Sequence, residues 1–241
     1  MIALALALLA PWVPAPGATF QWQLSGRLDL SVPADVYDVD LFGTSRADVA
    51  RIHAAGARAV CYFSAGTVER GRPDTRAFPR RVVGRPLEGW PDERWLDVRR
   101  LDVLGPILRR RLDRCAAKGF DGVEADNVDG YANRSGFRLR GRDQLRFNRW
   151  LARAAHARGL SIALKNDLGQ ARALEPAYDW ALNEQCFEYR ECERLRPFVA
   201  AGKAVFVVEY TDGDFCAAAQ AEGFMAQRKR LELDAWRRPC W

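Results

Sequence analysis

Short apolar runs alternate along the chain with segments whose apolar residues follow a helical repeat. The runs have the length and composition of buried strands, and they cover residues 20–24, 36–42, 59–64, 122–126, 161–165, 180–183 and 205–210. An eighth short run lies near 231–233. Helical patterns cover 45–55, 104–118 and 143–158. The chain is therefore predicted to alternate strands with helices.

Glycine marks the end of each predicted helix. Gly56, Gly119 and Gly159 each follow the last helical residue and stand shortly before the next strand. Glycine is the usual helix stop because it adopts the left-handed conformation without strain. This repeated unit implies parallel strands, and seven or eight of them in one domain favour a closed (β/α)8 TIM barrel.

One long segment, 66–97, lacks a clear period. We predict it as an extended loop after the third strand, able to wall a cleft. Its Trp90 and Trp95 have two readings, stacking on a sugar ring or packing into the core.

The first 18 residues differ from the rest of the chain. Residues 1–10 are almost entirely Ala and Leu, and 11–18 supply prolines and small residues. This pattern is typical of a secretory signal cleaved after Ala15 or Ala18, without the usual basic start. We predict 1–18 as an export segment and 19–241 as one domain, with a disordered or lipid-anchored tail as the alternative. No other stretch is apolar enough to span a membrane.

Composition narrows the class of protein. With 241 residues and 49% hydrophobic content, the chain can bury a large core. The net charge of +6 comes mostly from scattered arginines, which favours solvated helix faces over nucleic-acid binding. We therefore expect a secreted or periplasmic monomer that binds no nucleic acid.

Six cysteines agree with export, because an even number suits an oxidising compartment. Two bridges are predicted, Cys186 with Cys192 and Cys216 with Cys240. Cys61 and Cys115 are either free core thiols or a third bridge. Zinc is not predicted, since the chain has no CxxC pair and neither histidine lies near a cysteine.

Acidic and amide side chains stand at the ends of the predicted strands, which in a TIM barrel meet at the catalytic face. Residues 121–131 alone hold four carboxylates. Like charges so close repel, so a fold that clusters them usually needs them for chemistry, a metal or a cationic ligand. Glu184 ends another apolar run. Two carboxylates facing one cleft are the minimum equipment for hydrolysing a glycosidic bond.

Linked motifs at these strand ends resemble those of glycoside hydrolase family 114. The motifs lie at 61–66, 89–97, 121–131, 164–167, 183–186 and 205–210, and the similarity runs from about residue 20 to 210. The resemblance implies a (β/α)8 barrel with endo-α-1,4-polygalactosaminidase activity and no cofactor. By motif position, the family's two proposed catalytic carboxylates fall on Asp126 and Glu184.

An α-glycosidase needs one protonated carboxyl group and one ionised one. Asn127 and Lys165 near Asp126 favour its ionised form, so we assign Asp126 as nucleophile or base. Glu184 sits in a less polar run, which favours the general acid. The reverse assignment, with Glu184 as nucleophile or base and Asp126 as general acid, would use the same two residues.

Polar residues around this pair are predicted to bind the substrate, a cationic galactosamine-containing polysaccharide. They are Tyr62, Glu124, Asn127, Asp129, Tyr131, Lys165, Asn166, Gln185, Glu209 and Tyr210. Among them, Glu124, Asp129 and Glu209 are expected to pair with ammonium groups. The tyrosines are expected to contact sugar rings.

Two other functions remain open on the sequence. A non-catalytic polysaccharide-binding barrel would keep the aromatics and amides but has no need of both acids. A magnesium or calcium site on Glu124, Asp126 and Asp129 is the other reading, because such ions prefer oxygen ligands.

Overall fold

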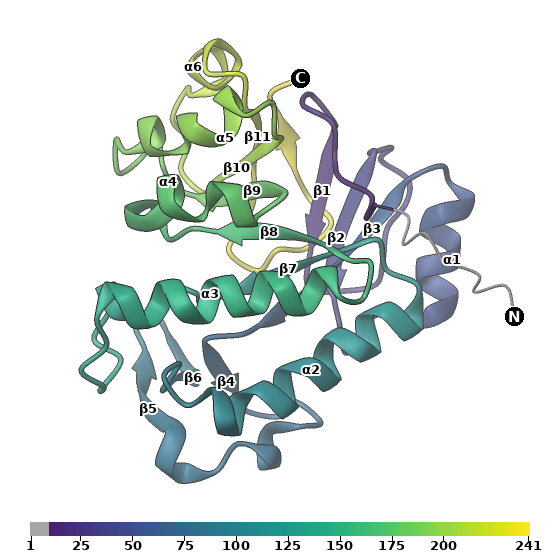
Figure 1. The fold of residues 1–241 in the computed structure, drawn as a ribbon. Coiled ribbons are helices and arrows are strands. Elements are labelled where there is room, and N and C mark those ends of the chain that lie inside the picture. The colour runs from purple at the N-terminus through teal and green to yellow at the C-terminus, as the bar shows by residue number, and fades with distance from the viewer. Residues whose placement is uncertain (1–9) are drawn as a thin grey trace, which may run out of the picture.

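Eight parallel strands form the centre of the protein. The computed structural model describes residues 10–241 and places these strands in one sheet, in the order in which they follow along the chain. They are β1 (Phe20–Gln23), β2 (Val36–Asp40), β3 (Arg58–Ser64), β7 (Gly122–Asp126), β8 (Ser161–Lys165), β9 (Trp180–Glu184), β10 (Val205–Glu209) and β11 (Met225–Arg228). The sheet curls on itself (Figure 1). The predicted single-domain α/β fold of the TIM-barrel type is confirmed.

The C-terminal segment fills the gap between the first and last parallel strands. Within the described residues, β1 pairs only with β2, and the outer edge of β11 pairs with the short antiparallel β12 (Arg238–Pro239). The Leu233 carbonyl instead accepts the backbone N–H groups of Leu24 and Ser25, at 2.8 and 3.1 Å. The prediction of an eighth strand near 231–233 is therefore wrong. Leu231 lies in an exposed turn, and the strand is β11, a few residues earlier.

Helices cover the first half of the barrel more heavily than the second. The three predicted helices are confirmed as α1 (Arg46–Ala54), α2 (Leu101–Lys118) and α3 (Gly141–His156). A 3-10 turn, η3 (Gly130–Ala132), precedes α3, and the later connections hold only short helices, α4 (Ala171–Leu174), α5 (Arg196–Ala200) and α6 (Cys216–Ala221), and 3-10 turns such as η4 (Leu168–Gln170) and η6 (Cys192–Leu195). Gly119 ends α2 with a φ of 91°, as expected for a glycine stop.

The segment predicted as an extended loop contains a small sheet of its own. It has three antiparallel strands, β4 (Thr67–Glu69), β5 (Val83–Leu87) and β6 (Trp90–Leu96), with the 3-10 turns η1 (Thr75–Ala77) and η2 (Arg80–Val82) between the first two. Pro86 and a register shift interrupt the β5–β6 pairing. This irregularity, together with charged residues on the strands, hides the alternation in the sequence.

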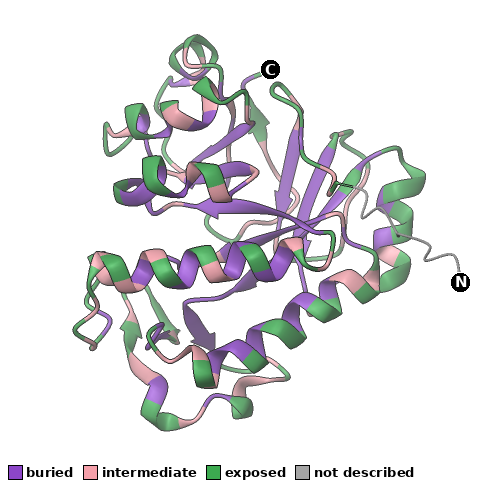
Figure 2. Ribbon diagram, viewed as in Figure 1, coloured by how far each residue is buried: buried purple, intermediate pink, exposed green. Residues whose placement is uncertain are grey.

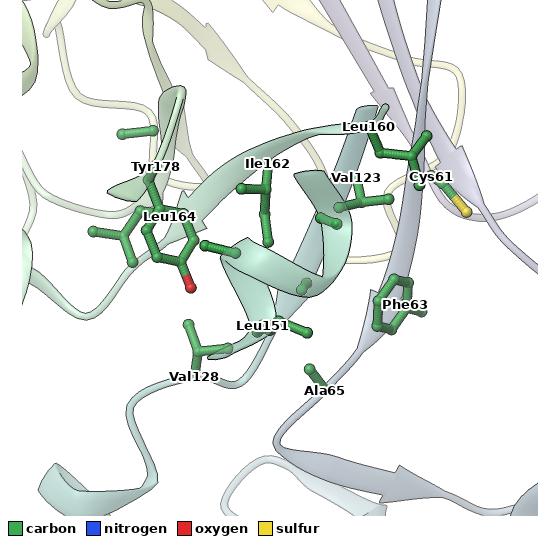
Figure 3. Close-up of a cluster of buried hydrophobic side chains, with 14 of the residues drawn as sticks. Cys61, Phe63, Ala65, Val123, Val128, Leu151, Leu160, Ile162, Leu164 and Tyr178 are labelled. Carbon is green, nitrogen blue, oxygen red and sulfur yellow. The ribbon is translucent and has the colours of Figure 1, made fainter. Parts of the chain in front are cut away.

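Two layers of core flank the barrel wall. The outer layer lies between the sheet and the helices, where Ile162 and Leu164 of β8 lie near Leu151 of α3 (Figure 3). The inner layer fills the barrel, with the Phe20 and Phe206 rings stacked 4.4 Å apart. Figure 2 shows that the strands of the barrel wall, which lie between the two layers, are mostly buried. Because side chains alternate along a strand, the strands that pack outward also aim Lys165 and its neighbours into the barrel.

The N-terminal segment joins this inner core. Residues 1–9 of the predicted export segment lie outside the described residues. Trp12 and Ala18, both partly buried, pack against the inner layer. Barrel packing therefore begins before the predicted boundary at residue 19, and cleavage after Ala15 would remove the Trp12 contact. From residue 10 onward, no helix has the length and hydrophobicity needed to cross a membrane.

Three disulfides join the six cysteines. The two predicted bridges, Cys186–Cys192 and Cys216–Cys240, are present. The pair left open by the sequence is also bridged, linking Cys61 in β3 to Cys115 in α2. Both of these sulfurs are fully buried, so the third bridge ties the barrel wall to its longest helix.

This buried bridge is expected to contribute the most to stability. It closes 54 residues, whereas Cys186–Cys192 closes 6. On the loop-entropy model, replacing both cysteines by alanine should cost about 4 kcal/mol for Cys61–Cys115 and about 2 kcal/mol for Cys186–Cys192. Urea unfolding of the two double variants measures the difference. Equal losses would contradict the loop-entropy argument.

Candidate active site

Five side chains from successive strands meet at the carboxyl end of the barrel. They are Tyr62 (β3), Asp126 (β7), Lys165 (β8), Glu184 (β9) and Tyr210, which follows β10. All five line one cavity of about 380 Å³. This volume lies within the range of small-molecule sites, and the position is that of active sites in this fold.

Lys165 is the centre of the cluster. Its Nζ lies 2.9 Å from Glu124 Oε1, 3.1 Å from Asp126 Oδ1 and 3.0 Å from Glu184 Oε2. The side chain is 1% exposed and lies over the Trp22 ring. Burial alone would lower the pKa of Lys165, but the surrounding carboxylates raise it well above its usual value. A permanent cation is thus held between two carboxyl groups that face the cavity.

Asp126 and Glu184 have matching surroundings. The Tyr62 hydroxyl donates to Asp126 Oδ2 at 3.1 Å, and the Tyr210 hydroxyl donates to Glu184 Oε1. An amide also supports each carboxylate, through the Asn127 backbone N–H for Asp126 and the Asn166 side chain for Glu184. The expectation that Glu184 has an apolar environment is therefore wrong, because Lys165, Asn166 and Tyr210 surround its carboxyl group.

Tight turns directly after the strands hold three amide residues at the rim of the cavity. Asn127, Asn166 and Gln185 each follow the last residue of β7, β8 or β9 and have positive φ values of 61°, 50° and 64°. Such values are uncommon for residues other than glycine and cluster at functional sites. Gly66 is required for a related reason, since a Cβ there would lie 1.7 Å from the Asn127 carbonyl oxygen.

Glu124 lies one layer below the cavity. It is fully buried, accepts the Trp22 indole N–H at 2.8 Å and is ion-paired with Lys165. Burial, followed by the charge of Glu124, raises the pKa of neighbouring Asp38 well above its usual value. Glu124 therefore holds Lys165 in place and does not line the cavity where an ammonium group was expected to meet it.

The other predicted contacts divide between two cavities and the core. Asn127, Asn166 and Gln185 line the main cavity. Asp129 and Tyr131 line a second cavity, which shares Asn166, Glu184 and Gln185 with the first. Glu209 lines neither of them. It is buried and accepts the Phe187 backbone N–H at 2.9 Å, which anchors the loop closed by Cys186–Cys192.

Several residues that line the main cavity are missing from the predicted set. They are Trp22 from β1, Glu69, Arg72, Trp90 and Glu93 from the β4–β6 region, and 231–233 from the C-terminal segment. Trp22 lies next to the last residue of β1, where Gln21 and Gln23 flank it. Trp95 is buried, as core packing requires, whereas Trp90 is 51% exposed in the cavity wall, where stacking on a sugar ring stays a prediction.

The predicted magnesium or calcium reading finds little support in the side chains. In residues 10–241, no group of three or more His, Cys, Asp and Glu side chains has the arrangement of a metal site. The oxygens of Glu124 and Asp126 instead surround the Lys165 ammonium group.

Comparison with solved structures supports the same fold. Ega3 of Aspergillus fumigatus, solved in complex with galactosamine, is 38% identical, covers 96% of this chain and 98% of its own, and superposes with a TM-score of 0.91. A variant of the glycoside hydrolase domain of PelA from Pseudomonas aeruginosa is 14% identical, with 91% and 97% covered and a TM-score of 0.76. The latter likeness shows the fold alone. No curated protein matches the chain.

The family follows from two independent matches. The model of glycoside-hydrolase family GH114 matches residues 2–241, nearly the whole chain. Ega3 exceeds the identity and coverage at which relatives share a family. The carboxylate pair at the strand ends is the equipment that glycoside hydrolysis requires. The chain therefore belongs to glycoside-hydrolase family GH114 and is a glycosidase.

Proposed function

We propose that the protein cleaves internal α-1,4 bonds of galactosamine-containing polysaccharide, with Asp126 and Glu184 as the two catalytic carboxyl groups. The observation that carries the proposal is their shared position: they reach the main cavity from the ends of β7 and β9, on either side of β8, and contact the same Lys165 ammonium. The galactosamine bound by Ega3 supports the sugar. The family resemblance supports cleavage within the chain.

The proposed mechanism divides the work between the two acids. Asp126, which contacts Lys165 and accepts the Asn127 backbone N–H, attacks the anomeric carbon, and Glu184 protonates the departing oxygen. One Nζ atom contacts both groups at 3.1 and 3.0 Å, so these two oxygens are at most 6.1 Å apart. This upper bound lies below the roughly 6.5–9.5 Å of inverting enzymes and allows the roughly 5–5.5 Å of retaining ones.

Polar and aromatic groups around the pair would hold the sugar. Tyr62, Tyr210 and the amides of Asn127, Asn166 and Gln185 line the cavity beside the carboxylates. The position of Asp129 and Tyr131 in the adjoining cavity fits a polymer that continues past Glu184. We propose a monomer, since one chain supplies all of these groups.

Export fits the same function. Three disulfides are typical of proteins that fold in an oxidising compartment, and a polysaccharide substrate lies outside the cytoplasm. We propose that the protein is secreted or periplasmic.

A comparison of two substrates tests the proposed activity. De-N-acetylated α-1,4-galactosaminan should be cleaved at least about tenfold faster than the fully N-acetylated polymer, because its ammonium groups are attracted to a partly dry acidic cleft. Product lengths from a defined oligomer show whether cleavage is internal. Binding of both polymers without any cleavage would instead favour the non-catalytic polysaccharide-binding barrel.

A further inference from the structure

The β4–β6 sheet forms one wall of the main cavity. Figure 1 shows its three strands grouped apart from the barrel. Side chains from these strands and the segment after β4 reach the same cavity as Asp126 and Glu184. They include two acids, Glu69 and Glu93, and the exposed aromatic ring of Trp90.

Glu69 and Glu93 face each other directly across the β4–β6 pairing. Like charges in this arrangement destabilise a sheet unless a cation compensates them. Burial is the main factor that raises the pKa of Glu93, to about 7, and the charges of Glu69 and Asp126 raise it further. Such a costly arrangement in a cavity wall indicates a ligand role.

The cations of the protein compensate this pair only in part. Arg72 contacts Glu69 Oε1 at 2.6 Å, but it also pairs with Asp40 at 2.7 Å. Glu69 is 8% exposed, and its second oxygen, Oε2, has no hydrogen-bond partner. Within residues 10–241, Glu93 forms no salt bridge at all. Glu93 is thus the carboxyl group that a cation from outside would pair with and keep ionised.

Neutral donors hold the Glu93 carboxylate in position. Its Oε2 accepts the Thr67 hydroxyl at 2.7 Å and the Asn127 side-chain amide at 3.5 Å. No described residue donates to Oε1, so this oxygen is available to a ligand. Asn127 is also the residue whose backbone N–H donates to Asp126, so the two carboxylates are fixed by one residue.

We propose that Glu93, backed by Glu69, binds the ammonium group of an amino-sugar unit next to the one being cleaved, with Trp90 stacking on the sugar ring. This inference rests on the proposed function for its substrate class. It adds a recognition site on the β4–β6 wall that is separate from the hydrolytic pair. Ammonium binding to a carboxylate in a partly dry cavity is stronger than in open water, which makes the site selective for de-N-acetylated units.

Binding measured by calorimetry tests the site independently of turnover. The probes are a de-N-acetylated α-1,4-galactosamine oligomer and its fully N-acetylated form. Glu93→Gln keeps the side-chain volume and an oxygen for Thr67, and it should weaken binding of the cationic oligomer about tenfold or more. Binding of the acetylated oligomer should stay within about twofold of its wild-type value, because that ligand carries no ammonium group.

Asp92→Asn is the matched control. Asp92 precedes Glu93 on β6, is 73% exposed and pairs with Arg70 outside the cavity, so its loss should leave binding unchanged. Salt should weaken binding of the cationic oligomer less steeply in Glu93→Gln than in the wild type. If Glu93→Gln fails to fold in a thermal melt, Glu69→Gln makes the same test from the partner strand.

The outcomes separate this inference from the proposed function. Wild-type cleavage of the polymer together with unchanged binding in Glu93→Gln overturns the ammonium site and leaves the glycosidase standing. If Glu93→Gln selectively weakens binding of the cationic oligomer but the wild type does not cleave the polymer, the ammonium site stands and the proposed activity is wrong. Equal losses for both oligomers, or no wild-type binding of the cationic one, overturn the inference.

Discussion

Asp126→Asn and Glu184→Gln are each expected to lower the rate of polymer hydrolysis by about 10³-fold or more. Each substitution keeps the size of the side chain but removes a carboxyl group from a mechanism that needs two. Lys165 keeps two carboxylate partners in either variant, so the fold should persist. Initial rates of reducing-end release, compared with a thermal melt of each variant, measure both effects.

Glu232→Gln is the control for the loss of any carboxylate from this cavity. Glu232 lines the same cavity from the exposed C-terminal segment, away from the strand ends. It should retain most of the activity. If Asp126→Asn or Glu184→Gln keeps a comparable share of the wild-type rate, the residue concerned is not catalytic.

External azide distinguishes the roles of the two acids. A small-residue variant of Asp126 leaves space beside the anomeric carbon, and azide can then replace the missing nucleophile. We expect rescue for Asp126→Ala and the formation of a glycosyl azide. If azide forms that product only with Glu184→Ala, the two roles are reversed.

The barrel could be predicted from the sequence because most of its strands are short, fully buried apolar runs. Residues 122–126 and 161–165 match β7 and β8, since both strands are almost wholly buried and their polar residues stand singly among apolar or small ones. The last strand, Met225–Arg228, carries Gln227 and Arg228 and has too few apolar residues to stand out. Leu231 and Leu233 are more apolar, but Leu231 lies in an exposed turn and the Leu233 carbonyl accepts hydrogen bonds from the residues after β1.

The shared position of Asp126 and Glu184, the proposed catalytic pair, could be predicted because both acids end a strand, and barrel geometry brings strand ends together. How far below the cavity a side chain lies was harder to predict from its position in the strand. Glu124 precedes Asp126 by two positions and faces the same way, but each pair of residues moves about 7 Å along the strand, so it lies in the core. Glu69 and Glu93 could not be placed, because their position depends on how an unpredicted sheet folds against the barrel.

Lys165→Met should produce the largest loss of stability among single substitutions at this site. Methionine preserves much of the shape, but Glu124 is then left fully buried, and Asp126 and Glu184 lose their shared cation. Removing one partner from a buried ion pair costs about 3–5 kcal/mol at neutral pH. Urea unfolding measures the loss. Lys203→Met is the control, since Lys203 is 24% exposed and pairs with Glu175, and it should cost about 1 kcal/mol.

The pH dependence of that loss identifies its electrostatic origin. In the wild type, the pKa of Lys165 is raised above its unfolded value of about 10.4, so its charge contributes fully throughout the acid and neutral range. Burial raises the pKa of Glu124 above its usual value even in the wild type, and without the cation that opposes this shift the pKa of Glu124 rises further. The folded variant then binds more protons than the unfolded chain, and its stability falls as pH rises. The deficit should therefore be larger at pH 7 than at pH 5. A deficit independent of pH would mean that lost packing, rather than uncompensated charge, is the cause.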